Sequence, residues 1–159
     1  LLAEAQLKTF LPGNFETTYL EGITASFNYL YENETGALVL PITPLITDYL
    51  TTNTGNRLVD ITAATSLEQR LEAIITQKYI ALNMINADEA WNDYRRTGFP
   101  VTVPGGQPAF DIASNKSNIT NRLDRLPTRI MYPSSEQSFN PANYRVVDYT
   151  TERIFWDPN

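Results

Sequence analysis

The segment from Ser66 to Pro100 most constrains the fold, because it has the pattern of two helices joined by a short turn. Ser66 followed by Gln69 is a capping-box pattern, in which hydroxyl and amide satisfy free backbone N–H groups, so a helix is predicted to begin at Leu67. Apolar side chains then recur at three- and four-residue steps, which is typical of one buried helix face. This face consists of Leu67, Leu71, Ile74, Ile75, Leu82, Ile85 and the aliphatic stem of Lys78.

A second helix is predicted directly after this one. Asp88 and Glu89 suit the positive N-terminal end of a helix, and Arg95 and Arg96 suit its negative C-terminal end. The sequence TGFP at 97–100 then stops the helix with glycine and proline. Two helices with a short turn between them form an αα-hairpin.

A similar hairpin is predicted over residues 1–31. Turn residues at 12–13 end its first helix, and Asn14 is a suitable N-cap for its second. The apolar face predicted for the first helix is Leu1, Leu2, Ala5 and Leu7, and the face predicted for the second is Phe15, Tyr19, Ile23, Ser26 or Phe27, and Leu30. Gly22 and Ala25 are small enough to let a neighbouring helix approach closely. Both hairpins resemble the units of a tetratricopeptide array.

The rest of the chain is rich in proline, asparagine and threonine, which indicates loops. The elements expected there are a helix over 44–50, a short strand over 101–103, a surface loop over 111–125 and a helix over 141–146 capped by Asn140. The predicted fold class is therefore mainly α. Tetratricopeptide-like hairpins at about 1–31 and 66–97 are followed by a proline-rich, irregular C-terminal section over 98–159.

Composition excludes several classes of function. The net charge of −6 offers no cationic surface for phosphate groups, so nucleic-acid binding is not expected. No run approaches the roughly 18 apolar residues that cross a bilayer. Because the chain has neither histidine nor cysteine, it contains no Ser-His-Asp triad, no Cys-His dyad and no ordinary zinc site.

Two pairs of acidic residues have the spacing of a glycosidase carboxylate pair, which lies roughly 5 to 10 Å apart. They are Glu68 with Glu72, and Glu89 with Asp93. Acids four residues apart are common on solvent-exposed helix faces, so we interpret both pairs in that way. An enzyme, a cofactor and a metal site are not expected.

The aromatic and arginine residues of the second hairpin allow two interpretations. Aromatic rings stack on sugars and arginine pairs with carboxylates, which is typical of ligand sites. Alternatively, Trp91 and Tyr94 face the core, Arg95 and Arg96 bond helix carbonyls or the next loop, and Trp156 anchors the end of the chain. The structural interpretation is favoured for all five residues.

Five segments in order resemble the C-terminal region of the SusD/RagB family, and in particular its SusD-like subgroup. They span nearly the whole chain: LLAEAQLKTF with NFETTYLEGITASFNYL at 1–30, QKYIAL at 77–82, EAWNDYRRTGFP at 89–100, RLPTRIMYPSSEQSFNP at 125–141 and TERIFWD at 151–157. The resemblance implies that the chain is the C-terminal part of a single SusD-like domain in a longer protein. It also implies that the main ligand site lies upstream of this chain.

The resemblance implies a lipid-anchored protein on the surface of a Gram-negative outer membrane, which contacts the membrane only through an anchor outside this chain. Such a protein captures a glycan or oligosaccharide and delivers it to a SusC-like TonB-dependent transporter. RagB-like peptide capture and a helical-repeat scaffold without a small ligand are the alternatives. Within this chain, the candidate ligand-binding residues are Phe110, Asn115, Lys116 and Asn118, on the predicted loop.

Overall fold

The computed structural model describes residues 1–101 and 127–158 of the chain. The elements of this part are α1 (Leu2–Leu7), α2 (Phe15–Tyr31), α3 (Thr43–Thr52), the 3-10 helix η1 (Ile61–Ala63), α4 (Leu67–Leu82), α5 (Ala87–Thr97) and α6 (Ser134–Phe139). The described residues form helices without a named strand, so the mainly α prediction is confirmed. None of the described helices has the length and hydropathy that crossing a membrane requires.

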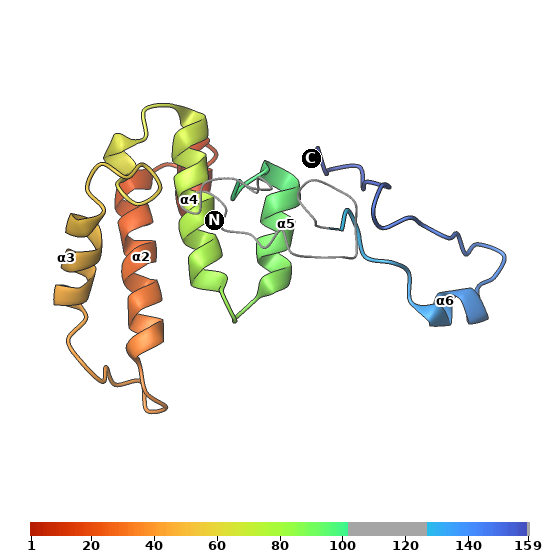
Figure 1. The fold of residues 1–159 in the computed structure, drawn as a ribbon, viewed down its shortest axis with the longest axis horizontal. Coiled ribbons are helices and arrows are strands. Elements are labelled where there is room, and N and C mark those ends of the chain that lie inside the picture. Colours follow the sequence, from red (N-terminus) through yellow and green to blue (C-terminus); the bar gives the residue numbers. More distant parts are fainter. Residues whose placement is uncertain (102–126, 159) are drawn as a thin grey trace. The chain divides into compact units, whose positions relative to one another are not determined.

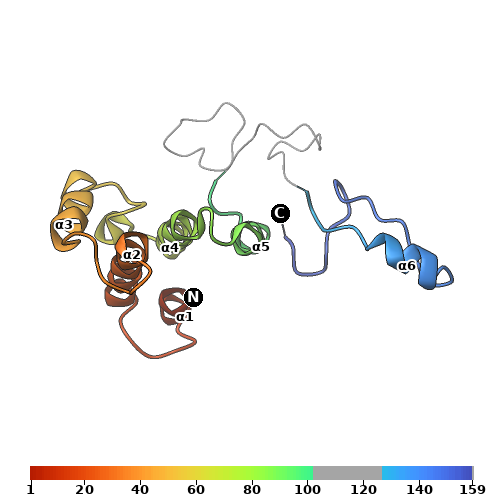
Figure 2. The same cartoon turned by 90° about the horizontal axis from the view of Figure 1, so that it is seen from below.

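The chain divides into two compact units, unit 1 (Leu1–Ala90) and unit 2 (Trp91–Asn159). In unit 1, α1 packs against both α2 and α4, and α2 also contacts α3 and α4 (Figures 1 and 2). Helix α5 begins in unit 1 and continues into unit 2. The last described segment, 127–158, is irregular apart from α6.

The core of unit 1 is an apolar cluster to which three helices and the η1 segment contribute. It consists of Ala3, Leu7, Tyr19, Ile23, Ile61, Ala64, Ala73 and Ile74. Half-buried side chains, including Phe15 and Phe27, pack against this cluster. Burial of the apolar side chains is the main source of stability for such a small helical unit.

Local capping signals place the starts of α2 and α4 where the sequence predicts them. The Asn14 side chain accepts hydrogen bonds from the backbone N–H groups of Glu16 (2.8 Å) and Thr17 (3.2 Å) at the start of α2. At α4, the Gln69 N–H donates to the Ser66 hydroxyl at 3.1 Å and the Ser66 N–H donates to the Gln69 amide at 3.3 Å. The capping box and the start at Leu67 are therefore confirmed.

The buried faces of α1 and α2 differ from the predicted ones. Leu1 and Leu2 are 74% and 51% exposed, whereas Ala3 and Leu7, one helical turn apart, are buried. On α2, Leu30 is 67% exposed although Ile23 is buried. The prediction was wrong at these positions because helical spacing specifies a stripe of residues but not how far the neighbouring helices extend along it.

The predicted helix over 141–146 is also wrong, because α6 lies before it and ends at Phe139. The Asn140 side chain does not cap a following helix. Its Nδ2 donates to Glu136 Oε1 at 2.6 Å and its Oδ1 accepts from Asn143 Nδ2 at 2.7 Å. With Asn140 used in this way, the following residues 141–143 form a turn. The strand predicted over 101–103 extends beyond the described residues, and the loop predicted over 111–125 lies wholly outside them.

A buried polar network joins α2, α3 and α4 to the segment before η1. The Tyr19 hydroxyl lies 3.0 Å from the Val59 carbonyl oxygen and 3.3 Å from that of Leu58. Gln77 donates from Nε2 to the Leu58 carbonyl at 3.0 Å and accepts from the Tyr49 hydroxyl at 3.2 Å. Burial raises the pKa of Tyr19 well above its ordinary value, so this phenol remains a neutral donor.

Replacing Tyr19 by phenylalanine is expected to lower the free energy of unfolding by about 1–2 kcal/mol. The ring remains in the core, but the buried Val59 carbonyl loses its donor. Urea denaturation followed by far-UV circular dichroism measures the change. A variant as stable as the wild type would show that water replaces the phenol at this carbonyl.

Candidate functional site

Three of the five family-like sequence segments, 89–100, 125–141 and 151–157, contribute residues that contact one another in unit 2. The Trp91 indole N–H on α5 donates to the Pro127 carbonyl at 3.0 Å, and Arg95 Nη1 donates to the Thr128 carbonyl at 3.1 Å. The guanidinium of Arg95 lies over two rings, 3.7 Å from the centroid of Trp91 and 4.6 Å from that of Trp156. We call Trp91, Arg95, Thr128, Trp156 and Asp157 the Arg95 cluster.

Arg95 is buried, with 7% of its surface exposed. Burial lowers the pKa of its guanidinium, and the negative charge of Asp157 opposes that shift. The group nevertheless remains charged at any physiological pH. It also donates from Nη2 to the Asn92 side chain, so both terminal nitrogens donate within unit 2 and two aromatic rings lie against the guanidinium. This arrangement holds chain segments together through hydrogen bonds and cation–π contacts.

Thr128 connects the cluster to a tight turn at 148–152. Its N–H donates to the Tyr149 carbonyl at 2.7 Å, and its hydroxyl lies 2.8 Å from that carbonyl and 2.7 Å from the Glu152 carbonyl. Hydrogen bonds from the Thr150 hydroxyl and N–H, and from the Thr151 hydroxyl, hold the pKa of Asp148 below its ordinary value. Sequence reasoning did not single out Thr128, although it lies in the recognised segment RLPTRIM.

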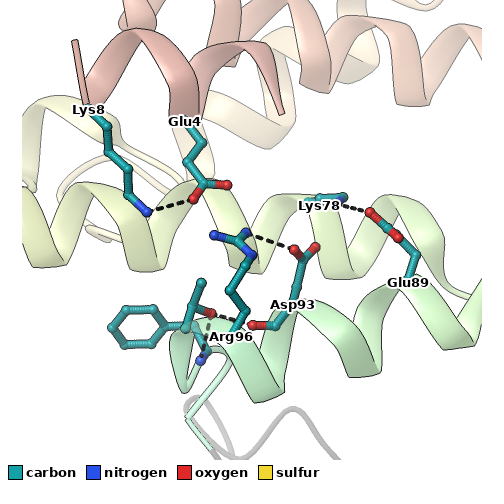
Figure 3. A network of polar contacts seen from close by, with 8 residues as sticks. Glu4, Lys8, Lys78, Glu89, Asp93 and Arg96 are labelled. Carbon is teal, nitrogen blue, oxygen red and sulfur yellow. Dashed lines mark hydrogen bonds and ion pairs between the residues drawn. The ribbon is translucent and has the colours of Figure 1, made fainter. Parts of the chain in front are cut away.

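The other aromatic and arginine residues of the motif occupy different surroundings. Arg96 Nη2 pairs with Asp93 Oδ1 at 2.9 Å (Figure 3), and its side chain is 37% exposed. Tyr94 is half-buried, and its carbonyl accepts the Gly98 N–H at 2.7 Å where α5 ends. Trp156 is 39% exposed and Phe155 is fully exposed. The structural roles assigned from the sequence to Trp91, Tyr94, Arg95, Arg96 and Trp156 therefore remain predictions.

The predicted ligand residues Phe110, Asn115, Lys116 and Asn118 lie outside the described residues. The described residues on either side of this segment are held by hydrogen bonds. On one side the Thr97 hydroxyl accepts the Phe99 N–H at 3.2 Å. On the other side the Pro127 carbonyl accepts the Trp91 indole N–H.

Unit 1 contains an apolar groove of about 570 Å³ between α1, α2 and α4. Its apolar lining includes Leu1, Leu2, Ile23, Leu30, Ile74 and Ile80. The polar groups at the groove include Tyr49 and Gln77, which bond each other, and Lys78, whose Nζ pairs with Glu89 at 2.7 Å (Figure 3). A groove with this lining suits a ligand with an apolar surface better than it suits a sugar, because the hydroxyls of a sugar need several hydrogen-bonding partners.

The acidic residues considered for catalysis are mostly engaged in ion pairs. Glu72 pairs with Arg57, Glu89 with Lys78 and Asp93 with Arg96. Glu68 is exposed on the first turn of α4. Within residues 1–101 and 127–158, no group of three or more acidic side chains could hold a metal ion.

Residues 1–152 match the SusD-like family model, which is described as "Susd and RagB outer membrane lipoprotein". The fold and this match define a helical, nutrient-binding lipoprotein of the outer membrane. The chain belongs to the SusD-like family, which confirms the resemblance seen in its sequence. No curated protein matches the chain. Trp156 and Asp157 lie just beyond the matched residues.

Proposed function

We propose that this protein captures oligosaccharides at the cell surface and delivers them to a SusC-like TonB-dependent transporter. The lipid anchor that holds it to the outer membrane lies outside this chain. The observation that carries the proposal is the family match over residues 1–152. We propose further that the chain belongs to a single SusD-like domain whose main ligand site is formed by residues outside it.

The described part of the chain supports binding in preference to catalysis. The acids with glycosidase-like spacing are mostly in ion pairs, and the buried guanidinium of Arg95 is committed to contacts within unit 2. A general acid needs a carboxyl group that is free to donate its proton to the substrate. These contacts favour scaffolding roles for the residues concerned.

Within this chain, the proposed ligand contacts are Phe110, Asn115, Lys116 and Asn118. An aromatic ring, two amides and an amine suit a sugar, because the ring stacks on its C–H face and the polar groups bond its hydroxyls. The residues that flank this segment support the proposal, because hydrogen bonds fix Phe99 on one side and Pro127 on the other. Flanks that are already ordered reduce the entropy that a binding segment loses on complex formation.

A neutral or weakly charged oligosaccharide is the proposed ligand class. The net charge of −6 repels sulfated or polyuronic chains at long range. Peptide capture of the RagB type is the second candidate, and the apolar groove of unit 1 favours it because apolar peptide side chains fit such a lining. The same groove would serve a helical-repeat scaffold that binds a protein partner.

Calorimetry on the full-length protein is expected to give saturable heat with members of a panel of neutral oligosaccharides and none with a peptide mixture. Replacing both Asn115 and Asn118 by alanine is expected to weaken oligosaccharide binding about thirtyfold, because two hydrogen bonds contribute about 1 kcal/mol each. Asn143→Ala, which removes an exposed amide elsewhere in unit 2, is the matched control. Saturable heat from peptides alone would establish the second candidate.

A further inference from the structure

We propose that the Arg95 cluster is a latch, in which residues 127–158 detach from Trp91 and Arg95 of α5 and reattach to them as one cooperative unit while unit 1 remains folded. The proposal is independent of the ligand, because it rests on contacts within unit 2. It assigns to Arg95 the positioning of two segments that are far apart in the sequence, 127–128 and 156–157.

The first step of the argument is that the contacts converge on one turn of α5. Trp91 and Arg95 lie four residues apart on the same helix face, and both hold the segment 127–128 through backbone carbonyls. Arg95 also lies against Trp156. Loss of this one guanidinium therefore removes contacts from both segments at once.

The second step is that Thr128 connects the segment 127–128 to the turn at 148–152, which precedes the segment 156–157 in the chain. Its backbone and hydroxyl contact the carbonyls of Tyr149 and Glu152, and only 1% of its surface is exposed. Arg145 pairs with Glu152 at 2.8 Å, which holds the same turn from outside. Segments coupled in this way open together, because breaking one contact exposes the buried polar groups of the others.

The third step concerns what is buried. Unit 1 buries many apolar residues. In the described part of unit 2, the buried apolar residues are Pro100 and Val147. The other buried residues of that part are Asp93, Arg95, Thr128 and Asp157. Unit 2 thus depends on hydrogen bonds, charge and cation–π contacts, and segments with little apolar burial are the first to open.

The chain's own tryptophans allow a direct test, because both of them, Trp91 and Trp156, belong to the cluster. Urea denaturation should use a full-length protein in which any tryptophan other than Trp91 and Trp156 has been replaced, so that the fluorescence reports on the cluster alone. The unfolding is followed by tryptophan fluorescence and by far-UV circular dichroism. Most of the helix in the described part of the chain lies in α2, α3 and α4, and hydrogen exchange can assign signals to these helices. We expect the fluorescence transition at lower urea than the loss of helix in unit 1.

Hydrogen exchange measured by mass spectrometry then tests the role of Arg95. In Arg95→Met, exchange of the Thr128 amide and of the amides over 149–157 is expected to rise by a common factor of about tenfold or more, with α2 and α4 unchanged. Arg95→Lys keeps the charge but loses the planar fork, so an intermediate increase is expected. Arg153→Met is the matched control, since it removes an exposed arginine of the same segment and should change exchange little.

Three results would overturn the latch. One is a wild-type fluorescence transition that coincides with the loss of helix in unit 1. Another is an Arg95→Met effect confined to the Thr128 amide, which would show that the two segments open independently. The last is an equal rise in the exchange of α2 and α4, which would show that Arg95 supports the global fold and not a separate unit.

Discussion

Replacing Ile23 by alanine is expected to lower the free energy of unfolding of unit 1 by about 2–3 kcal/mol. Ile23 is 4% exposed and belongs to the core cluster with Tyr19 and Ile74. Large-to-small substitutions of this kind cost about 2–5 kcal/mol, depending on how far the surroundings collapse into the space. Because Ile23 also lines the apolar groove, water reaches part of that space, which places the cost in the lower half of the range.

Leu30→Ala is the matched control, because it removes a similar volume from the same helix at a position predicted to share the buried face. Leu30 is 67% exposed, so its replacement should change the free energy of unfolding by about 0.5 kcal/mol or less. Urea denaturation followed at 222 nm measures both variants. Equal losses would mean that another part of the protein covers Leu30, and a small loss for Ile23→Ala would contradict the core described here.

The helices of unit 1 could be predicted because their signals are local. The Asn14 cap, the Ser66–Gln69 capping box and the proline in the first turn of α3 each act within a few residues, and each operates in the structure. Such interactions depend on backbone geometry at a helix end and not on the rest of the chain. The mainly α class followed from them.

The buried positions were harder to predict, because they depend on which helices are neighbours. On α4, Ile74 and Ile75 are buried as expected, but Leu67 is 58% exposed at the first turn. The Asn140 signal failed for a related reason. An asparagine side chain can bond several partners, and Glu136 and Asn143 compete with the N–H groups of a following helix.

The sequence predicted which segments belong to the candidate site, but it did not predict the contacts that those segments make with one another. The sequence identified Trp91, Arg95 and Trp156 as structural candidates, and the structure brings them together around one guanidinium. Nothing in the sequence pattern indicates that Thr128, far from α5 along the chain, lies at this position. That contact depends on tertiary structure, which periodicity and capping rules do not describe.

Replacing Trp91 by alanine is expected to destabilise the attachment of residues 127–158 by about 2–3 kcal/mol. A fully buried tryptophan costs about 3–5 kcal/mol, but Trp91 is half-buried, which lowers the apolar contribution. The substitution also removes the cation–π contact with Arg95 and the hydrogen bond to Pro127, which contribute about 1 kcal/mol each. Hydrogen exchange of amides 149–157 measures the opening free energy directly.

Trp91→Phe separates these contributions, because the phenyl ring keeps a face for the guanidinium and loses the donor to the Pro127 carbonyl. A loss of about 1 kcal/mol is expected for it. Oligosaccharide affinity should change in either variant only as far as the attachment opens. A Trp91→Ala protein with wild-type exchange rates and abolished oligosaccharide binding would reverse the assignment, because the indole would then contact the ligand and not hold the chain.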